Sequence, residues 1–292
     1  MGYALSGGRA IRFVGMMPSE VFAPDLLAGH VALVTGGGTN LGRAAAAELV
    51  ACGADVVIAG RRAEVLEQAA ADLGPRCAWV SGDIRSAADC ERIVDAALER
   101  HGHVDTLLNN AGGQYFSAAE AITPKGWAAV LRLNVDGTQN MTRACAERAL
   151  RPNGGGMIAS VTVSPHQGFP GMAHSGAARA GVEAMTREWA ERWEADGISA
   201  VALALGRFDT ESLRKYPAEL TGSLARSVPL GRLGEPREFG WLAALVASPL
   251  GRALSGSTIT LDGGADNWWG PWPPVGLTAD DGTVPAEERR GR

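Results

Sequence analysis

Short apolar runs alternate with amphipathic stretches along most of the 292-residue chain, and this alternation constrains the fold more than any single motif. The apolar runs are short and continuous, as expected for strands that are buried on both faces. The seven expected strands are Val31–Thr35, Asp55–Ala59, Cys77–Ser81, Thr106–Asn109, Met157–Val161, Ser199–Leu203 and Ser257–Leu261. The six expected helices are Leu41–Cys52, Glu64–Leu73, Ala87–Arg100, Gly126–Leu150, Met172–Ala195 and Pro236–Ser248. Strands that alternate with helices in this way predict a parallel sheet covered by helices on both faces.

The alternating pattern fills residues 28–265, which we interpret as one domain without internal repeats. Residues 1–28 show no apolar segment of the signal-peptide type, so we expect a flexible N-terminal extension. Residues 266–292 are expected to form a Trp- and Pro-rich tail, which contains Trp268, Trp269 and Trp272. Large aromatic side chains favour interfaces, so we expect the tail to pack on its own domain or on a neighbouring subunit. The alternative is a lid over an apolar substrate.

The composition narrows the functional classes. A net charge of -5 argues against a nucleic-acid-binding protein that works through bulk positive charge. The four cysteines lie far apart and form no C-x-x-C pair, which argues against a zinc site and against a disulfide framework. No apolar run reaches the roughly 18 residues that a membrane span requires. We therefore expect a cytoplasmic enzyme that acts on a small molecule and binds no metal.

The first expected strand runs into a glycine-rich turn at Thr35–Gly42, and a helix follows directly. This strand–turn–helix arrangement places a pyrophosphate on the N-terminus of a helix. Gly36 permits the tight turn, and Gly42 permits close packing of the helix against the strand. The cofactor-binding residues expected in the turn are Gly36, Gly38, Thr39, Asn40, Leu41 and Gly42. Together with the alternating elements, the turn predicts a single Rossmann-type, doubly wound, seven-stranded parallel sheet.

Four motifs, spread over about residues 30–264, resemble the short-chain dehydrogenase/reductase family. The glycine turn is similar to the family's T-G-x-x-x-G-x-G, with Asn40 in place of the middle glycine. The segments Asp105–Gly112, Leu133–Val135 and Asp262–Gly264 are similar to its D-x-L-x-N-N-A-G, N-V and D-G-G segments. The resemblance implies an oxidoreductase that binds a nicotinamide dinucleotide.

The resemblance also assigns cofactor roles to residues at the ends of strands. Asp83, after the third strand, is expected to accept a hydrogen bond from the adenine amino group, with Ile84 packed on the ring. Residues after the fourth and sixth strands are expected to line the ribose, the pyrophosphate and the nicotinamide carboxamide. They are Asn109, Asn110, Ala111, Gly112, Gly206, Phe208 and Thr210.

The end of the second strand indicates which nicotinamide cofactor is bound. Proteins that bind NAD carry a carboxylate there, which accepts a hydrogen bond from the ribose 2′-OH. In this chain the strand ends in Ala59-Gly60-Arg61-Arg62, without a carboxylate. Because an arginine can pair with a 2′-phosphate in a bidentate manner, Arg61 and Arg62 predict NADP(H). The alternative is that both arginines are solvated surface residues.

The expected catalytic centre departs from the family's usual Asn, Ser, Tyr and Lys. Asn134 is retained, but the serine, tyrosine and lysine positions hold Thr162, Ser175 and Arg179. Arg179 can donate hydrogen bonds to ribose hydroxyls, yet it is not expected to carry protons because the pKa of arginine stays above about 12. Ser175 is a poor general acid near neutral pH. Interconversion of a ketone and an alcohol by the family's usual mechanism is therefore not expected.

The segment His174–Val182 resembles a subgroup of the family, the trans-2-enoyl-CoA and 2,4-dienoyl-CoA reductases, which also lack the tyrosine at its usual place. Their reaction turns a carbonyl into an enolate, so the site must donate hydrogen bonds to that oxygen and a proton to carbon. The candidates near the end of the fifth strand are Thr162, Ser164, His166 and His174. Either histidine can supply the proton, because histidine titrates near neutral pH. The alternatives are an exposed turn position for His166 and a structural role at the helix start for His174.

We interpret the chain as an NADP(H)-dependent oxidoreductase that reduces the C=C bond of an enoyl thioester or a related enone. In one alternative, the protein binds the same cofactor but is a dehydrogenase or ketoreductase for a terpenoid, polyketide or other secondary-metabolite carbonyl or alcohol. Another is a nucleotide-binding protein with a degenerate redox site, which serves as a sensor, scaffold or non-redox catalyst.

Two further expectations concern the substrate and the assembly. Residues 211–232 are expected to cover an apolar or acyl-thioester substrate, and basic residues there suit an anionic carrier; solvated surface charge is the alternative. The helices expected at 126–150 and 172–195 carry more apolar surface than one sheet face needs. With the resemblance, they predict a homodimer or homotetramer.

Overall fold

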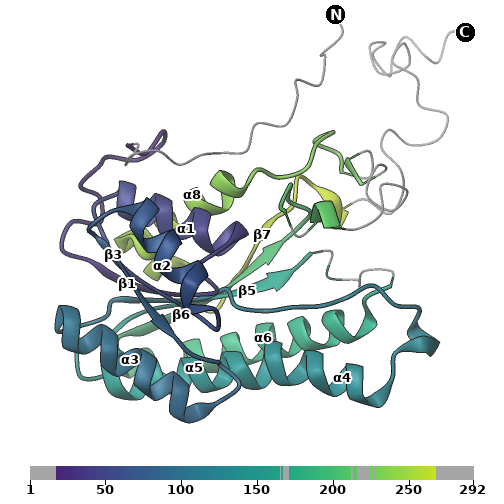
Figure 1. Cartoon of the computed structure of the whole chain (residues 1–292), viewed down its shortest axis with the longest axis horizontal. Helices are drawn as coiled ribbons and strands as arrows, with labels where there is room; N and C mark the ends of the chain where they lie inside the picture. Colours follow the sequence, from purple (N-terminus) through teal and green to yellow (C-terminus); the bar gives the residue numbers. More distant parts are fainter. Residues whose placement is uncertain are drawn as a thin grey trace, which may run out of the picture.

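Seven parallel strands form one sheet in the order β3-β2-β1-β4-β5-β6-β7 (Figure 1). The computed structural model describes residues 18–164, 166, 171–211, 213–215, 224–225 and 228–267. The strands are β1 (Val31–Thr35), β2 (Asp55–Gly60), β3 (Cys77–Ser81), β4 (Thr106–Asn109), β5 (Gly156–Val163), β6 (Ile198–Leu205) and β7 (Thr258–Leu261). The strand order reverses at β1, which pairs with β2 on one side and with β4 on the other. The predicted fold class is confirmed, and the point of reversal is where such sheets bind ligands.

Helices cover both faces of the sheet, as predicted (Figure 1). They are α1 (Asn40–Ala51), α2 (Ala63–Leu73), α3 (Ala87–His101), α4 (Pro124–Leu131), α5 (Gly137–Cys145), α6 (Ala173–Arg192) and α8 (Pro236–Ala247). On one face α1, α2 and α8 bury Leu49, Leu66 and Phe239 against the sheet. On the other face α3, α5 and α6 bury residues such as Ile93 and Met141. These two apolar layers hold the strand ends, and therefore the site, in fixed positions.

The helix expected over residues 126–150 begins at Pro124 and is divided by two π-helical turns. They span Arg132–Asp136 and Ala146–Leu150, with α5 between them. A π turn widens the hydrogen-bond spacing from four residues to five, which rotates the side chains that follow. The difference from the prediction matters for the site, because Asn134 lies within the first π turn.

Packing extends to residues before position 28. Leu27 is buried, and its backbone N–H donates a hydrogen bond to the carbonyl of Cys52 at 2.9 Å. The Ser19 hydroxyl donates to the Glu48 carboxylate at 2.5 Å. Residues 1–17 and the predicted tail tryptophans lie outside the described residues. In the described part of the chain, no helix is long and apolar enough to cross a membrane.

Candidate cofactor and catalytic site

The glycine turn is held to the end of β4 by hydrogen bonds of Thr35. Its hydroxyl accepts from the backbone N–H groups of Asn110 and Ala111, both at 3.0 Å, and donates to the Leu108 carbonyl at 3.3 Å. The Asn110 side chain donates to the Thr35 carbonyl at 3.0 Å. Gly36 has a φ of 66°, so the turn needs a residue that adopts the left-handed region without strain. These bonds join the two strands at the point where the sheet order reverses.

The N-terminus of α1 faces this turn and favours an anion. Its N-cap residue, Thr39, makes no side-chain capping bond, and the first turn of the helix contains no acidic residue. A Cβ at Gly42 would collide with the Gly36 carbonyl, so the close approach of helix and turn requires glycine there. The backbone N–H groups at the start of a helix and the helix dipole together suit a pyrophosphate.

Asn40 stands where the family pattern has a glycine, and its backbone explains why the exchange is tolerated. Its φ is 47°, in the left-handed region, which asparagine adopts more readily than most residues. Its side-chain carbonyl also accepts a hydrogen bond from the backbone N–H of Glu211 at 3.2 Å. The asparagine therefore links the nucleotide turn to the segment after β6.

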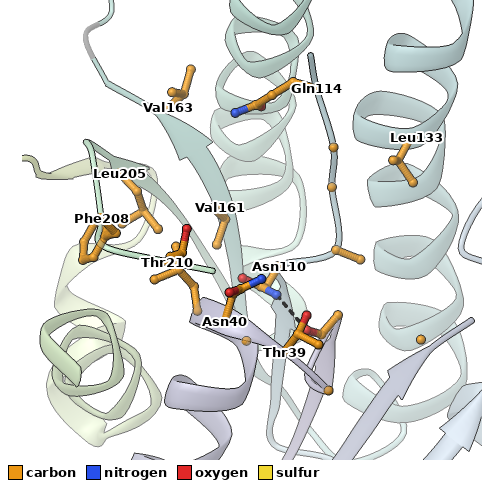
Figure 2. Close-up of a pocket in the computed structure, with 18 of the residues that line it drawn as sticks. Thr39, Asn40, Asn110, Gln114, Leu133, Val161, Val163, Leu205, Phe208 and Thr210 are labelled. Atoms are coloured by element: carbon orange, nitrogen blue, oxygen red, sulfur yellow. Dashed lines mark hydrogen bonds between the residues drawn. The ribbon is translucent and has the colours of Figure 1, made fainter. Parts of the chain in front are cut away.

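A cavity of about 540 Å³ opens along the carboxyl ends of the central strands. Figure 2 shows Thr39 and Asn40 from the glycine turn near Asn110 from the end of β4 and Thr210 from the segment after β6. With the exception of Asn109, the residues predicted to bind the cofactor line this cavity. They are Gly36, Gly38, Thr39, Asn40, Leu41, Gly42, Arg61, Arg62, Asp83, Ile84, Asn110, Ala111, Gly112, Arg179, Gly206, Phe208 and Thr210. Asn109, also considered for the ribose, instead points inward and donates to the Thr142 hydroxyl at 2.8 Å.

The adenine end of the cavity carries two exposed arginines. Arg61 and Arg62 lie at the end of β2, and neither forms an ion pair within 4 Å among the described residues. Asp83 lies across from them at the end of β3 and is paired with Arg85, whose Nε lies 2.9 Å from Asp83 Oδ1. The hydrogen bond from Arg85 holds the pKa of Asp83 below its usual range, so this carboxylate stays ionised.

Arg179 is the one buried cation on the cavity wall in the described part of the chain. It is 7% exposed, and its Nη1 donates to the Val161 carbonyl at 2.7 Å. Its Nε has no acceptor among the described residues, and no carboxylate pairs with the guanidinium there. Burial lowers the pKa of Arg179 to about 10, which is below the value expected from the sequence but still leaves it charged at neutral pH. The guanidinium lies against Gly112, whose position has no room for a Cβ.

Asn134 does not line the cavity and braces it instead. Its side chain donates to the carbonyls of Gly113 and Val130, each at 2.8 Å, and accepts from the Gly113 N–H at 3.2 Å. The Thr138 hydroxyl donates to the Asn134 carbonyl at 2.8 Å. Asn134 therefore fixes the segment that follows β4, including the glycines beside Arg179.

Thr162 and Ser164 line the cavity from the end of β5, as predicted. Each hydroxyl, however, donates its proton to a carboxylate: Thr162 to Glu183 at 2.8 Å, and Ser164 to Asp262. Both side chains therefore present oxygen lone pairs, and not a free proton, to a ligand in this arrangement.

The structure does not bring His166, His174 and Ser175 to the cavity wall. His174 is fully buried edge-on against Tyr115, with 4.4 Å between ring centroids, and neither ring nitrogen has a partner among the described residues. The Ser175 hydroxyl donates to the side-chain carbonyl of Gln114 at 2.9 Å. His166 is exposed and pairs with carboxylates near the surface.

Several cavity residues were not foreseen from the sequence. Gln114 reaches the cavity from the segment after β4, and Leu133 and Val163 also line it (Figure 2). Gln114 follows directly after the glycine pair 112–113, which is a signal that could have included it. Arg207 also lines the cavity, and burial lowers its pKa although Asp262 opposes the change.

Residues 211–232, here called the basic loop, contain Arg214, Lys215, Arg226 and Arg232, which were expected to suit an anionic carrier. Two of these side chains form ion pairs. Arg214 pairs with Asp209 at 2.8 Å, and Arg232 pairs with Glu238 at 2.7 Å. These pairs favour the alternative that the charges are surface charges. Arg226, a third basic residue of the loop, lies outside the described residues.

The sheet order, the uncapped helix and the glycine turn define a dinucleotide-binding α/β protein. The fit of a nicotinamide dinucleotide rests on the anion-binding turn and on Arg179, which has no carboxylate partner among the described residues. Residues 37–266 match the family model described as enoyl-(acyl carrier protein) reductase, so the chain belongs to the short-chain dehydrogenase/reductase family. It is therefore an oxidoreductase.

The alignments with known relatives cover most of the chain. A probable 2,4-dienoyl-CoA reductase from Bacillus subtilis is 33% identical and covers 82% of this chain and 97% of its own. A peroxisomal 2,4-dienoyl-CoA reductase from Danio rerio is 33% identical, with 85% of each chain covered. Among solved structures, a citronellol catabolism dehydrogenase from Pseudomonas aeruginosa is 35% identical, with a TM-score of 0.76 and coverage of 84% of this chain and 98% of that one.

Proposed function

We propose that this protein is an NADP(H)-dependent reductase that acts on the C=C bond of an enoyl thioester or a related enone. The observation that carries the proposal is Arg179, a buried guanidinium on the cavity wall without a carboxylate partner among the described residues. No tyrosine lines this cavity in the described part of the chain, so a phenol that protonates an alcohol oxygen is not provided there. The relatives named as 2,4-dienoyl-CoA reductases support the same class of reaction.

The chemistry of C=C reduction suits these residues. A bound nicotinamide supplies the hydride. As the C=C bond accepts it, negative charge develops on the conjugated carbonyl oxygen. Arg179 provides a fixed positive charge for that oxygen or for the adjacent ribose, in surroundings where burial strengthens electrostatic interactions. The product still needs a proton at carbon. Neither predicted source, His166 or His174, lines the cavity, so we expect the proton to reach the carbon through another group.

The preference for NADP(H) rests on the end of β2. Arg61 and Arg62 line the cavity there and carry no ion pair among the described residues. Their guanidinium groups are therefore available to a 2′-phosphate, and no carboxylate at this strand end competes for the ribose hydroxyl.

The decisive experiment follows NADPH oxidation with four substrates: crotonyl-CoA, a 2,4-dienoyl-CoA, an enone without a carrier, and a simple ketone. We expect turnover of the two thioesters and little or none of the ketone. Turnover of the ketone alone would reject the proposal and favour a carbonyl or alcohol substrate, to which the likeness to a citronellol catabolism dehydrogenase points. NADPH binding without turnover of any substrate would favour a degenerate redox site.

We also propose that the chain assembles as a homodimer or homotetramer through α4, α5 and α6. Trp127 on α4 is 39% exposed, and large aromatic side chains are enriched at protein interfaces. Light scattering at micromolar concentration should therefore report at least twice the monomer mass, and a monomer would contradict this. A cytoplasmic location stays a prediction, since the relatives include an enzyme named as peroxisomal.

A further inference from the structure

A chain of polar contacts leads from the cavity wall to the protein surface at the end of β5. Thr162 lines the cavity and is 3% exposed, and its hydroxyl donates to Glu183 Oε1 at 2.8 Å. The same carboxylate oxygen lies 3.4 Å from His166 Nε2. The other ring nitrogen of His166, Nδ1, lies 2.5 Å from Asp266 Oδ2. Because a third of the His166 side chain is exposed, the chain joins a buried hydroxyl to solvent.

Glu183 occupies the middle of this chain. It lies on α6, four residues after Arg179, and its side chain is only 12% exposed. No arginine or lysine pairs with it within 4 Å among the described residues, so its charge is not committed to an ion pair with a permanent cation. Its Oε1 faces a hydroxyl on one side and an imidazole on the other. A carboxylate placed in this way can take a proton from one neighbour and pass it to the other.

His166 is placed to hold a proton near neutral pH. Burial lowers the pKa of His166, but the hydrogen bond to Asp266 and the charges of Glu183, Asp266 and Asp262 outweigh it, so the pKa is raised. Glu183 faces the ring from α6, and the two aspartates face it from the segment after β7. No basic group among the described residues opposes these charges.

We propose that Glu183 relays a proton from His166 at the surface to Thr162 in the cavity, a step that rests on the proposed C=C reduction. His166 Nε2–H gives its proton to Glu183, and the neutral Glu183 then donates to Thr162 Oγ1. The Thr162 O–H turns into the cavity and gives its proton to the enolate carbon while Thr162 takes the proton of Glu183. One N–H bond is broken, one C–H bond is formed, and His166 regains a proton from solvent. The relay moves no electrons.

The neighbouring hydroxyl does not offer an equivalent path. Ser164 also donates to a carboxylate, Asp262. Asp262 also accepts from the backbone N–H groups of Gly264 and Asp266, at 2.8 and 2.7 Å. Peptide N–H groups do not titrate in this pH range, so they cannot replace a proton that Asp262 passes on. The path through Glu183 ends at His166, which does titrate and can take a new proton from solvent.

The test compares Glu183→Gln, His166→Gln and the double variant with the native protein. In the native protein kcat should fall as the pH rises through the pKa of His166, because the donor loses its proton. Each single variant should lower kcat by about 10- to 100-fold at neutral pH and remove this decline, since water replaces only part of the acid catalysis. The double variant should be no slower than either single variant, because both remove the same path. Glu183→Asp should restore part of the rate and the pH dependence.

Two readouts separate the relay from a structural role and from the proposed function itself. The dissociation constant for NADPH should stay unchanged in all variants, and NMR titration should show a lower pKa for His166 in Glu183→Gln. Glu188→Gln, an exposed carboxylate on the same helix, is the matched control and should behave as the native protein does. Native rate and pH dependence in both single variants would overturn the relay and leave the proposed function intact. If the native protein reduces none of the C=C substrates, the proposed function and the relay both fail.

Discussion

Replacing Arg61 with Asp is expected to reverse the cofactor preference from NADPH to NADH. A 2′-phosphate gains charge-assisted hydrogen bonds from the guanidinium, each about 1.5–3 kcal/mol. The introduced carboxylate would remove these bonds, repel the phosphate and accept a hydrogen bond from the 2′-OH of NADH. The ratio of the dissociation constants for NADPH and NADH should rise by about 10³-fold, or about 4 kcal/mol. Fluorescence titration of the purified protein with each cofactor measures this ratio.

The control for this substitution is an exposed arginine that does not line the cavity. Arg187→Gln, on α6, removes one positive charge and should leave the ratio unchanged. If the native protein binds NADPH and NADH with equal affinity, Arg61 does not read the 2′-phosphate and the assignment is wrong.

Replacing Arg179 with Met is expected to lower the activity and at the same time raise the melting temperature. The variant loses the buried charge beside the cavity, so kcat/KM for an enoyl thioester should fall by about 10²–10³-fold, as for other donors that stabilise an anionic oxygen. NADPH should also bind more weakly, because Arg179 is the predicted partner of the ribose. The melting temperature should nevertheless rise, since the native guanidinium is buried with a single described hydrogen bond and no carboxylate partner.

A second substitution at this position tests whether the activity depends on the positive charge of residue 179 or on the shape of its side chain. Arg179→Lys keeps a cation, but the burial that lowers the pKa of Arg179 to about 10 acts on a group whose ordinary pKa is already about 10.4. The lysine should therefore lose its proton as the pH rises, and the activity of the variant relative to the native protein should fall toward alkaline pH. A ratio that stays constant from pH 6 to pH 9 would show that the charge of this residue is not used.

The fold and the cofactor cavity could be predicted because both depend on local features of the sequence. Apolar strands followed by turn residues place their carboxyl ends at one edge of the sheet, and the glycine turn identifies the edge of β1. Apart from Asn109, the residues predicted to bind the cofactor lie on this edge or on the helix behind it, and they line the cavity. Of the two asparagines after β4, Asn110 reaches the cavity, whereas Asn109 is the last residue of the strand and points into the core.

The catalytic side could be predicted only in part, because it depends on contacts between distant segments. The π turn that contains Asn134 has no periodic signature, and it directs that side chain onto Gly113. The first turn of α6 buries His174, although the sequence places it next to the tyrosine position. Glu183 was not foreseen because nothing in its local sequence indicates that it meets Thr162 and His166.

The N-terminus of α1, which has no side-chain cap, and the guanidinium of Arg179, which has no carboxylate partner among the described residues, lie along the same cavity, and both carry positive charge. Like charges that face one cavity from weakly polar surroundings repel each other, which lowers the free energy of unfolding. An anion bound between them raises the free energy of unfolding again, by an amount that increases with the logarithm of its concentration. In such a protein the resistance to unfolding, and with it the rate of degradation, would follow the supply of its nucleotide.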